Sequence, residues 1–342
     1  MSDTLQDVAQ AMVRPGQGIL AADESTGTIK KRFDTIQLES TETSRRDYRE
    51  MLFRTEQAMK DHISGVILFD ETLRQSAADS TPFVDLMKAA GCVPGIKVDK
   101  GAKALAGSNG EQVTEGLDGL RERLAEYYDL GARFAKWRAV VHIADGRPTR
   151  NALKANAHAL ARYAALCQEA KIVPIVEPEV LMDGAHSSHD IDRCYEVTCD
   201  TLQIVFDELY DANVMLEGMV LKPNMVVPGQ TSAVQASAAE VAEKTVRCLK
   251  SHVPSAVPGI AFLSGGQSDV LATEHLSLMN AMGGLPWALT FSYGRALQAS
   301  ALAAWSGKSE NVAAGQRAFA HRAKMNSLAA TGGWTASQEQ AA

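Results

Sequence analysis

The sequence predicts a closed (β/α)₈ TIM barrel, in which eight parallel strands alternate with helices. Short runs rich in apolar and β-branched residues recur along the chain, and longer amphipathic stretches rich in Ala, Leu, Glu, Lys and Arg separate them. No linker rich in Gly, Pro or Ser divides the 342 residues. Regular strand–helix alternation without a break favours one closed barrel over an open doubly wound sheet.

Eight short segments carry the strand pattern. Since a strand–helix–strand connection is right-handed and makes its two strands parallel, the eight are expected to pair in sequence order. The predicted strands are residues 18–23, 65–69, 95–99, 132–140, 171–180, 217–224, 259–266 and 286–294. Residues 1–342 are therefore expected to form a single catalytic domain, which ends in a helix and a mobile tail within about 306–342.

The composition narrows the functional classes. With 46% apolar and 22% charged residues, the chain has the content of a globular protein with a large core. The net charge is −7 and the basic residues are dispersed rather than gathered into a stripe, which argues against a nucleic-acid partner. The sequence has neither a signal-peptide pattern nor an apolar run that would span a bilayer, so no membrane partner is expected. Five cysteines without a C-x-x-C pair argue against a disulfide framework or structural zinc, and favour the cytoplasm.

Charged side chains lie toward the carboxyl ends of several predicted strands, where the active sites of such barrels assemble. A strand alternates its faces with a period of two, which places these charges in pairs. The predicted set is Asp23, Lys97 with Asp99, Lys136 with Arg138, Glu177 with Glu179, and Lys222 with Asn224. One such charge would face solvent as readily as a site, but several together indicate a shared polar mouth. Together with Arg295, the five cations outnumber the three carboxylates Asp23, Glu177 and Glu179, which suits a polyanionic ligand.

Two glycine turns follow the seventh and eighth predicted strands. Ser264, Gly265 and Gly266 end one strand, and Gly294 and Arg295 end the next, each just before a helix. Glycine lets backbone amides approach a phosphate, and a helix N-terminus adds free N–H groups and a favourable dipole. Barrels commonly bind phosphate at these two loops, so a phosphate group is expected here.

Lys222 stands in the middle of an apolar strand pattern, in LEGMVLKPNM. Lowering its pKa from about 10.4 to about 7 requires roughly 4 to 5 kcal/mol against the cation. A second ammonium group nearby supplies roughly 3 to 4 kcal/mol, and burial supplies the rest. Lys136 is the expected neighbour. With its amine neutral, Lys222 attacks a carbonyl to form a Schiff base. With its amine charged, Lys222 would only bind a phosphate.

Schiff-base chemistry also requires groups that move protons. The carboxylates available for this are Glu177, Glu179 and Asp23, and partial burial is expected to raise a carboxyl pKa toward the working range. Their spacing leaves the assignment of roles among them open.

Seven segments, in this order, resemble the signature segments of class I fructose-bisphosphate aldolases. They are GILAADESTGTIKKR, GIKVDKG, AKWRAV, IVEPEV, LEGMVLKPNMV, FLSGGQS and FSYGRALQ, and the resemblance extends from about residue 5 to 335. It implies a (β/α)₈ barrel that reversibly cleaves fructose 1,6-bisphosphate to dihydroxyacetone phosphate and glyceraldehyde 3-phosphate, in glycolysis and gluconeogenesis. It also implies a homotetramer that needs no metal or other cofactor, with sugar phosphates as its small-molecule partners.

The resemblance also implies roles for individual residues. Lys222 matches the Schiff-base lysine, and Glu177 matches the acid and base that dehydrates the carbinolamine. Glu179 and Lys136 match charged neighbours of the imine, and Asp23 matches the carboxylate linked to proton removal in bond cleavage. The matching positions are Ser264, Gly265, Gly294 and Arg295 for one phosphate, and Ser25, Thr28 and Lys97, with Lys31, Arg32 and Arg138 nearby, for the other.

The chain departs from the family pattern in three places. Thr28 replaces the usual serine but keeps the hydroxyl, and the segment DGAHSSHDID is a few residues longer than usual. Many members end in a tyrosine that reaches the active site, whereas this sequence has no tyrosine after Tyr293. The resemblance therefore implies that another group handles the late proton transfer.

Three alternatives remain open from the sequence. His186 and His189 would suggest a zinc-dependent aldolase, but a third ligand is not evident and no metal site is predicted. Another Schiff-base enzyme on phosphorylated ketoses, such as a transaldolase, would share the lysine but would not need two phosphate sites. A non-catalytic scaffold role is compatible with the sequence as an additional function.

Overall fold

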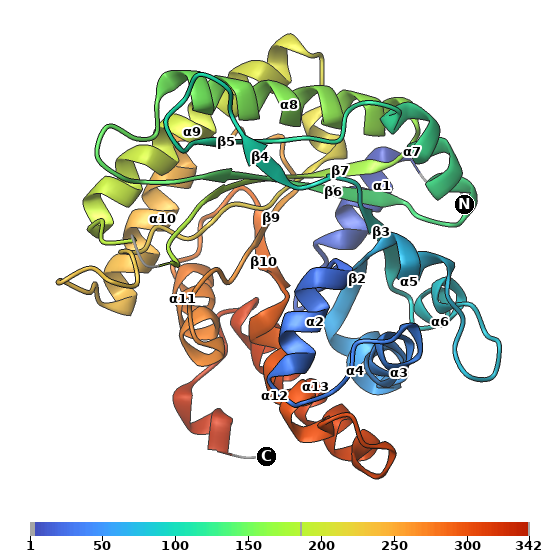
Figure 1. Cartoon of the computed structure of the whole chain (residues 1–342). Coiled ribbons are helices and arrows are strands. Elements are labelled where there is room, and N and C mark those ends of the chain that lie inside the picture. The colour runs from blue at the N-terminus through green and yellow to red at the C-terminus, as the bar shows by residue number, and fades with distance from the viewer. Residues whose placement is uncertain (1–3, 185–186, 341–342) are drawn as a thin grey trace.

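A computed structural model describes residues 4–184 and 187–340. Eight parallel strands close into a barrel in the order β1-β10-β9-β8-β7-β6-β3-β2, with helices around it (Figure 1). The predicted (β/α)₈ barrel is confirmed. Its strands are β1 (Gly18–Ala22), β2 (Ile63–Leu68), β3 (Val93–Lys97), β6 (Phe134–Val141), β7 (Val173–Val180), β8 (Val220–Leu221), β9 (Gly259–Phe262) and β10 (Ala288–Tyr293).

Helices cover the outside of the barrel and join successive strands (Figure 1). Thr4, Thr41, Thr149, Asp190, Ser237 and Ser268 each cap a helix with a side-chain oxygen, as short polar residues favour. The helices before β6 are α1 (Leu5–Met12), α2 (Thr26–Asp34), α3 (Glu42–Phe53), α4 (Glu56–His62), α5 (Asp70–Arg74), α6 (Phe83–Ala89) and α7 (Leu120–Asp129). Those after it are α8 (Arg150–Glu169), α9 (Ile191–Asp211), α10 (Ala238–His252), α11 (Asp269–Ala281), α12 (Arg295–Trp305) and α13 (Val312–Ala329), with 3₁₀ turns η1 (Leu216–Gly218), η2 (Ser309–Asn311) and η3 (Ala336–Gln340).

The strand that precedes Lys222 is much shorter than predicted. Turn η1 occupies the expected start, and Pro223 cannot donate a ladder hydrogen bond, so β8 holds two residues. Lys222 still donates its backbone N–H to Val176 O of β7 at 2.8 Å. Asn224 does not continue the predicted alternation, because its side chain accepts from Val180 N and donates to Thr198 of α9.

A hairpin that the sequence reading missed lies between β3 and α7. Strands β4 (Ala102–Ala104) and β5 (Gln112–Thr114) pair antiparallel and run beside α8 (Figure 1). Thr114 donates its hydroxyl to Arg138 O at 2.8 Å. The hairpin therefore supports β6 near its carboxyl end, where two predicted site residues lie.

The core has an inner and an outer layer. Inside the barrel, apolar residues of the strands pack against α1, whose Val8, Ala9 and Met12 are buried with them. The outer layer lies between strands and helices. Packing inside is close, because a Cβ added to Gly95 would lie 2.3 Å from the ring of Phe134. The apolar inner layer leaves polar residues to gather at the carboxyl ends of the strands.

The C-terminal segment is attached to the outer helices. Glu339 accepts hydrogen bonds from Trp334 Nε1 at 2.9 Å and from Arg322 of α13. Mobility of the segment within 306–342 stays a prediction. Among the described residues, none of the helices combines the length and apolar character that a membrane span requires.

Candidate active site

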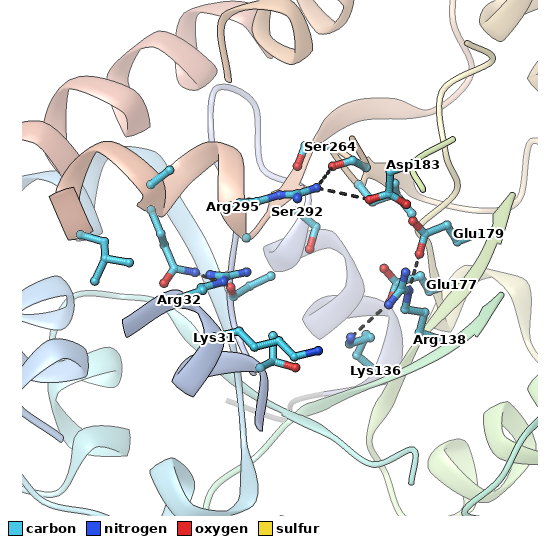
Figure 2. A pocket seen from close by; sticks show the side chains of 18 of the residues that line it. Lys31, Arg32, Lys136, Arg138, Glu177, Glu179, Asp183, Ser264, Ser292 and Arg295 are labelled. Carbon is cyan, nitrogen blue, oxygen red and sulfur yellow. Dashed lines mark hydrogen bonds and ion pairs between the residues drawn. The ribbon is translucent and has the colours of Figure 1, made fainter. Parts of the chain in front are cut away.

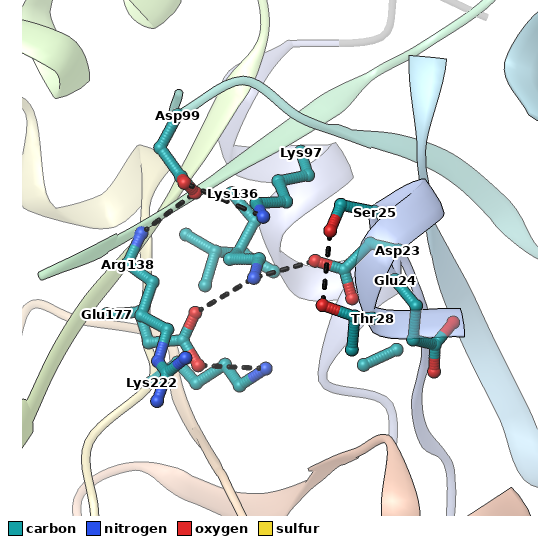
Figure 3. A network of polar contacts seen from close by, with 12 residues as sticks. Asp23, Glu24, Ser25, Thr28, Lys97, Asp99, Lys136, Arg138, Glu177 and Lys222 are labelled. Carbon is teal, nitrogen blue, oxygen red and sulfur yellow. Dashed lines mark hydrogen bonds and ion pairs between the residues drawn. The ribbon is translucent and has the colours of Figure 1, made fainter. Parts of the chain in front are cut away.

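A cavity of about 590 Å³ opens at the carboxyl ends of the barrel strands (Figure 2). Most of the predicted site residues line it. These are Thr28, Lys31, Arg32, Lys136, Arg138, Glu177, Glu179, Lys222, Ser264, Gly265, Gly294 and Arg295. Asp23, Ser25 and Lys97 are not in the lining, but they lie around Lys136 in the same polar network (Figure 3).

A continuous chain of ion pairs joins three buried residues, Lys222, Glu177 and Lys136, to half-buried Asp23 in that network (Figure 3). Lys222 Nζ lies 3.1 Å from Glu177 Oε1, and Lys136 Nζ lies 3.3 Å from Glu177 Oε2. Lys136 Nζ also lies 2.7 Å from Asp23 Oδ2. The two lysines therefore share the carboxylate of Glu177, and the ammonium group of Lys136 also pairs with Asp23.

Lys222 is only 4% exposed, and its pKa is held below the usual range. Burial is the largest cause, because a desolvated ammonium group is costly, and the charge of Lys136 adds to it. Glu177 acts in the opposite direction without cancelling these effects. The sequence reading assigned the larger part to Lys136, and the structure instead gives it to burial.

The neighbours of Lys222 favour their charged forms. Burial lowers the pKa of Lys136, but Asp23 and Glu177 together raise it above the usual range. Burial likewise raises the pKa values of Asp23 and Glu177, and the lysines more than reverse this. The expectation that the net pKa of a buried carboxyl rises toward the working range is therefore wrong for these two carboxylates.

Glu179 is the one of the three predicted carboxylates whose pKa is raised. Burial raises it, and the ion pair with Arg138 only partly offsets that effect. Arg138 lies on β6, and the register places it beside Glu177 of β7. The Glu179–Arg138 pair thus closes the cavity wall next to the lysine network (Figure 2).

Arg295 and the β9–α11 loop form one cationic end of the cavity. Gly265 adopts a φ of +50°, and a Cβ there would lie 2.6 Å from Met182 Cε, so the loop needs glycine. Arg295 donates to Gly265 O at 2.6 Å and lies 3.5 Å from Asp183 Oδ2 (Figure 2). Gly294 precedes the first residue of α12, whose free N–H groups face this end.

The N-terminus of α2 forms a second polar end. Ser25 is the N-cap residue, and its hydroxyl lies 3.1 Å from the Thr28 hydroxyl instead of capping the helix. Lys31 and Arg32 follow on the same helix and line the cavity. Lys97 lies 3.7 Å from Asp99 on the side of the network that holds Ser25 (Figure 3).

Sequence reasoning missed the residues that hold Arg32 in place. Buried Glu24 shares its carboxylate between Arg32 and buried Arg49 of α3. Burial raises the pKa of Glu24, but the two guanidinium groups lower it below the usual range. Glu24 follows Asp23 directly, so strand alternation alone would place it on the opposite face, away from the predicted charges.

Ser292 and Asp183 are among the polar lining residues that were also missed. Ser292 is 1% exposed, and its hydroxyl has no hydrogen-bond partner among the described residues, although it lines the cavity. Asp183 adds a carboxylate to the Arg295 end. The period-two pattern of β10 could have placed Ser292 inside the barrel. The structure agrees with that pattern, because Tyr293 next to it points outward and donates its hydroxyl to Ala272 O of α11.

Of the two histidines of the zinc alternative, the structure describes one. His186 lies outside the described residues, and His189 is 9% exposed. Within the described parts of the chain, one set of His, Cys, Asp and Glu side chains is close enough to share an ion. It is Cys199, Cys248 and His252 on α9 and α10, away from the cavity lining.

His275 supports the β9–α11 loop and makes stability depend on pH. It is 2% exposed, its Nδ1 lies 2.5 Å from Gln267 Oε1, and burial lowers its pKa to about 4. The unfolded chain binds this proton below about pH 6.5, and the folded chain only near pH 4. The contribution of neutral His275 to stability is therefore fully present above about pH 6.5, and about 3 kcal/mol of stability is expected to be lost through this residue toward pH 4.

Urea unfolding at pH 7 and pH 4.5 measures this dependence. The His275→Gln variant, which keeps a hydrogen-bonding side chain without the titration, should lose less stability over this interval than the unaltered chain. Equal losses in the two proteins would contradict the assignment to His275.

Comparisons with known proteins agree with this geometry. The model of the family "Fructose-bisphosphate aldolase class-I" matches residues 4–342. A probable fructose-bisphosphate aldolase class 1 of Xanthomonas axonopodis pv. citri is 58% identical over 333 residues, 97% of this chain and 98% of that protein. The cytosolic fructose-bisphosphate aldolase 4 of Arabidopsis thaliana is 56% identical over 321 residues, 94% and 81% of the two chains.

A solved structure extends the agreement to three dimensions. Fructose-bisphosphate aldolase from Plasmodium falciparum, in complex with TRAP and a small molecule inhibitor, superposes with a TM-score of 0.94. It is 50% identical and covers 97% of this chain and 95% of its own. The chain belongs to the class I fructose-bisphosphate aldolase family and is a lyase that cleaves fructose 1,6-bisphosphate.

Proposed function

We propose that this chain cleaves fructose 1,6-bisphosphate through a Schiff base on Lys222, without a metal. The observation that carries the proposal is the buried amine of Lys222, whose pKa is lowered and whose Nζ lies 3.1 Å from Glu177. A lowered pKa increases the share of the neutral amine, which is the nucleophilic form. The cavity is bordered by two cationic ends that suit a bisphosphate. We therefore take the ketone of a bisphosphorylated sugar bound between these ends as the target of the amine.

Glu177 transfers protons while the imine forms. The neutral amine of Lys222 attacks the C2 carbonyl, and Glu177 accepts the proton that the nitrogen loses. Glu177 returns this proton to the alkoxide oxygen, which gives the carbinolamine, and a second proton taken up from solvent through Glu177 lets the hydroxyl leave as water and yields the iminium. Its contacts with both Lys222 and Lys136 support this role, since a carboxylate within hydrogen-bond distance can act as base and then as acid.

Asp23 acts in bond cleavage. As the C3–C4 bond breaks, its electron pair flows into the iminium and gives an enamine, and the C4 hydroxyl proton passes to a base. Asp23 is ionised, because the lysines lower its pKa, and it lies 2.7 Å from Lys136. Lys136 stays charged and orients both carboxylates, and Glu179 keeps Arg138 in the wall.

One phosphate binds at Ser264, Gly265, Gly294 and Arg295, and the other near Ser25, Thr28 and Lys97. Lys31, Arg32 and Arg138 add positive charge between these two ends. Arg295 supports the first assignment, because its side chain is 58% exposed and its guanidinium contacts Gly265 of the β9–α11 loop. A transaldolase would not need both ends, and the family membership favours bisphosphate cleavage.

Replacing Arg295 by Ala tests the phosphate assignment. A guanidinium–phosphate contact is charge-assisted, so KM for fructose 1,6-bisphosphate should rise about 10-fold or more while kcat changes less. Steady-state cleavage assays with the bisphosphate and with fructose 1-phosphate measure this effect, with Arg121→Ala, an exposed arginine on α7, as the control. An unchanged KM for both sugars would refute the role of Arg295.

The cellular setting is proposed from the relatives. Fructose-bisphosphate aldolases named cytosolic in Arabidopsis thaliana and cytoplasmic in Spinacia oleracea support the cytoplasm as the location. There the chain acts in glycolysis and gluconeogenesis as a single-domain subunit of a homotetramer. Light scattering at micromolar concentration measures the subunit number, and a stable monomer would refute the tetramer.

A further inference from the structure

Two cysteines meet where α9 packs against α10. Cys199 and Cys248 share a hydrogen bond with their Sγ atoms 3.0 Å apart, although 49 positions separate them in the sequence. Cys199 is 8% exposed and Cys248 is fully buried. His252 lies at the same place, with its Nδ1 3.0 Å from Cys248 O and a ring nitrogen within 4.8 Å of both sulfurs.

Their surroundings make one thiol reactive. The pKa of Cys199 is lowered, chiefly because the Cys248 thiol donates a hydrogen bond to its thiolate, and His252 adds to the effect. The same contact, together with burial, raises the pKa of Cys248. By contrast, burial raises the pKa of Cys92 to about 12 and that of Cys194 to about 11, so these thiols remain protonated.

We propose that Cys199 and Cys248 form a redox-active pair, which low-molecular-weight disulfides such as glutathione disulfide convert to an intrachain disulfide between α9 and α10. The Cys199 thiolate attacks one sulfur of glutathione disulfide, and the departing glutathione thiolate takes up a proton. Cys248 then loses its proton and attacks Cys199 Sγ, which releases the second glutathione. Two cysteine thiols are oxidised, one glutathione disulfide is reduced to two thiols, and no further oxidant is needed.

The second step is favoured by the first. Once Cys199 is in the mixed disulfide, the hydrogen bond between its thiolate and the Cys248 thiol is gone, and so is its negative charge, so the largest cause of the raised pKa of Cys248 disappears. Cys248 is already beside its target, because a disulfide requires the two sulfurs to approach by only about 1 Å.

The pair is connected to the chain around Lys222. Asn224 donates to Thr198 of α9 at 3.1 Å, and Val226 N donates to Thr245 Oγ1 of α10 at 2.9 Å. Thr198 precedes Cys199, and Thr245 lies one turn before Cys248. Drawing the helices together therefore shifts the segment that follows Lys222, and reversible loss of cleavage activity is expected on oxidation, since small displacements of reacting groups are costly.

Alkylation and mass spectrometry test the proposal on the full chain. After incubation with glutathione disulfide, denaturation and N-ethylmaleimide, the protein should carry three alkyl groups instead of five, with one peptide crosslink between Cys199 and Cys248. Dithiothreitol should restore five groups and the activity. The Cys248→Ser variant should stop at one glutathione adduct on Cys199, and Cys199→Ser should form no adduct.

Cys92→Ser is the matched control, because Cys92 is buried and its thiol donates to Met59 O and Ile63 O, a bond that serine can keep. It should still form the crosslink. Five alkyl groups in the oxidised protein, or a crosslink between other cysteines, would overturn the proposal. Protection of both thiols by added Zn²⁺ without any crosslink under glutathione disulfide would also overturn it and make the cluster a cation site. A complete crosslink with unchanged kcat would overturn the connection to Lys222.

Discussion

The Lys222→Met variant is expected to lose at least about 10⁴-fold in kcat for fructose 1,6-bisphosphate cleavage, because it lacks the amine that binds the ketone covalently. Methionine has a similar length and no charge, and position 222 is 4% exposed, so the fold should tolerate it. Residual kcat is measured by coupling the triose phosphates to reduction of one product. Thermal unfolding of the same preparation establishes that the barrel is intact.

The matched control for this substitution is Lys30→Met. Lys30 lies on α2, its side chain is 61% exposed, and it pairs with Asp34 on the surface. Its loss should leave kcat and KM essentially unchanged. A folded Lys222→Met protein with kcat near that of the control would contradict the Schiff-base mechanism.

The Glu177→Gln variant is expected to lose about 10²- to 10⁴-fold in kcat, the range that a positioned acid–base group contributes. Glutamine keeps the shape and one carbonyl acceptor, but it cannot accept the proton of the attacking amine. It also removes the negative charge that Glu177 places beside Lys222 and Lys136, so the pKa of Lys222 should fall further. The acidic limb of the pH–rate profile should therefore move to lower pH while the maximal rate drops.

Single-turnover experiments separate these two effects. Rapid mixing of excess enzyme with substrate should show slow imine formation in Glu177→Gln. The control is Glu169→Gln, since Glu169 is an exposed partner of Arg121 at the end of α8. An acidic limb that moves to higher pH, or imine formation at the control rate, would exclude Glu177 as the proton-transfer group.

Much of the fold was accessible from the sequence because strand and helix periodicities differ and alternate along this chain. All eight predicted strands overlap barrel strands. The errors have local causes. Strand β8 is short because η1 and Pro223 flank it, and the β4–β5 hairpin was missed because each of its strands has only three residues.

The site was predictable where charges follow the period of a strand. Lys136 and Arg138 on β6, and Glu177 and Glu179 on β7, line one cavity, as alternation predicts. Asn224 departs from the alternation because the chain leaves the sheet after Lys222.

Properties that depend on three-dimensional contacts were not accessible. The sequence reading identified Lys136 as the main cause of the lowered pKa of Lys222, but burial is larger. It expected raised carboxyl pKa values, yet two lysines lower those of Asp23 and Glu177. The relative size of desolvation and charge interactions depends on distances of a few ångströms, which a one-dimensional pattern does not contain.

Borohydride reduction in the presence of dihydroxyacetone phosphate tests the central claim most directly. Reduction converts an imine to a stable secondary amine, so peptide mass spectrometry then locates the reacting lysine. The account predicts one adduct per chain, on Lys222, and none in Lys222→Met. An adduct on Lys136 or Lys31, or the absence of any adduct in an active enzyme, would contradict it.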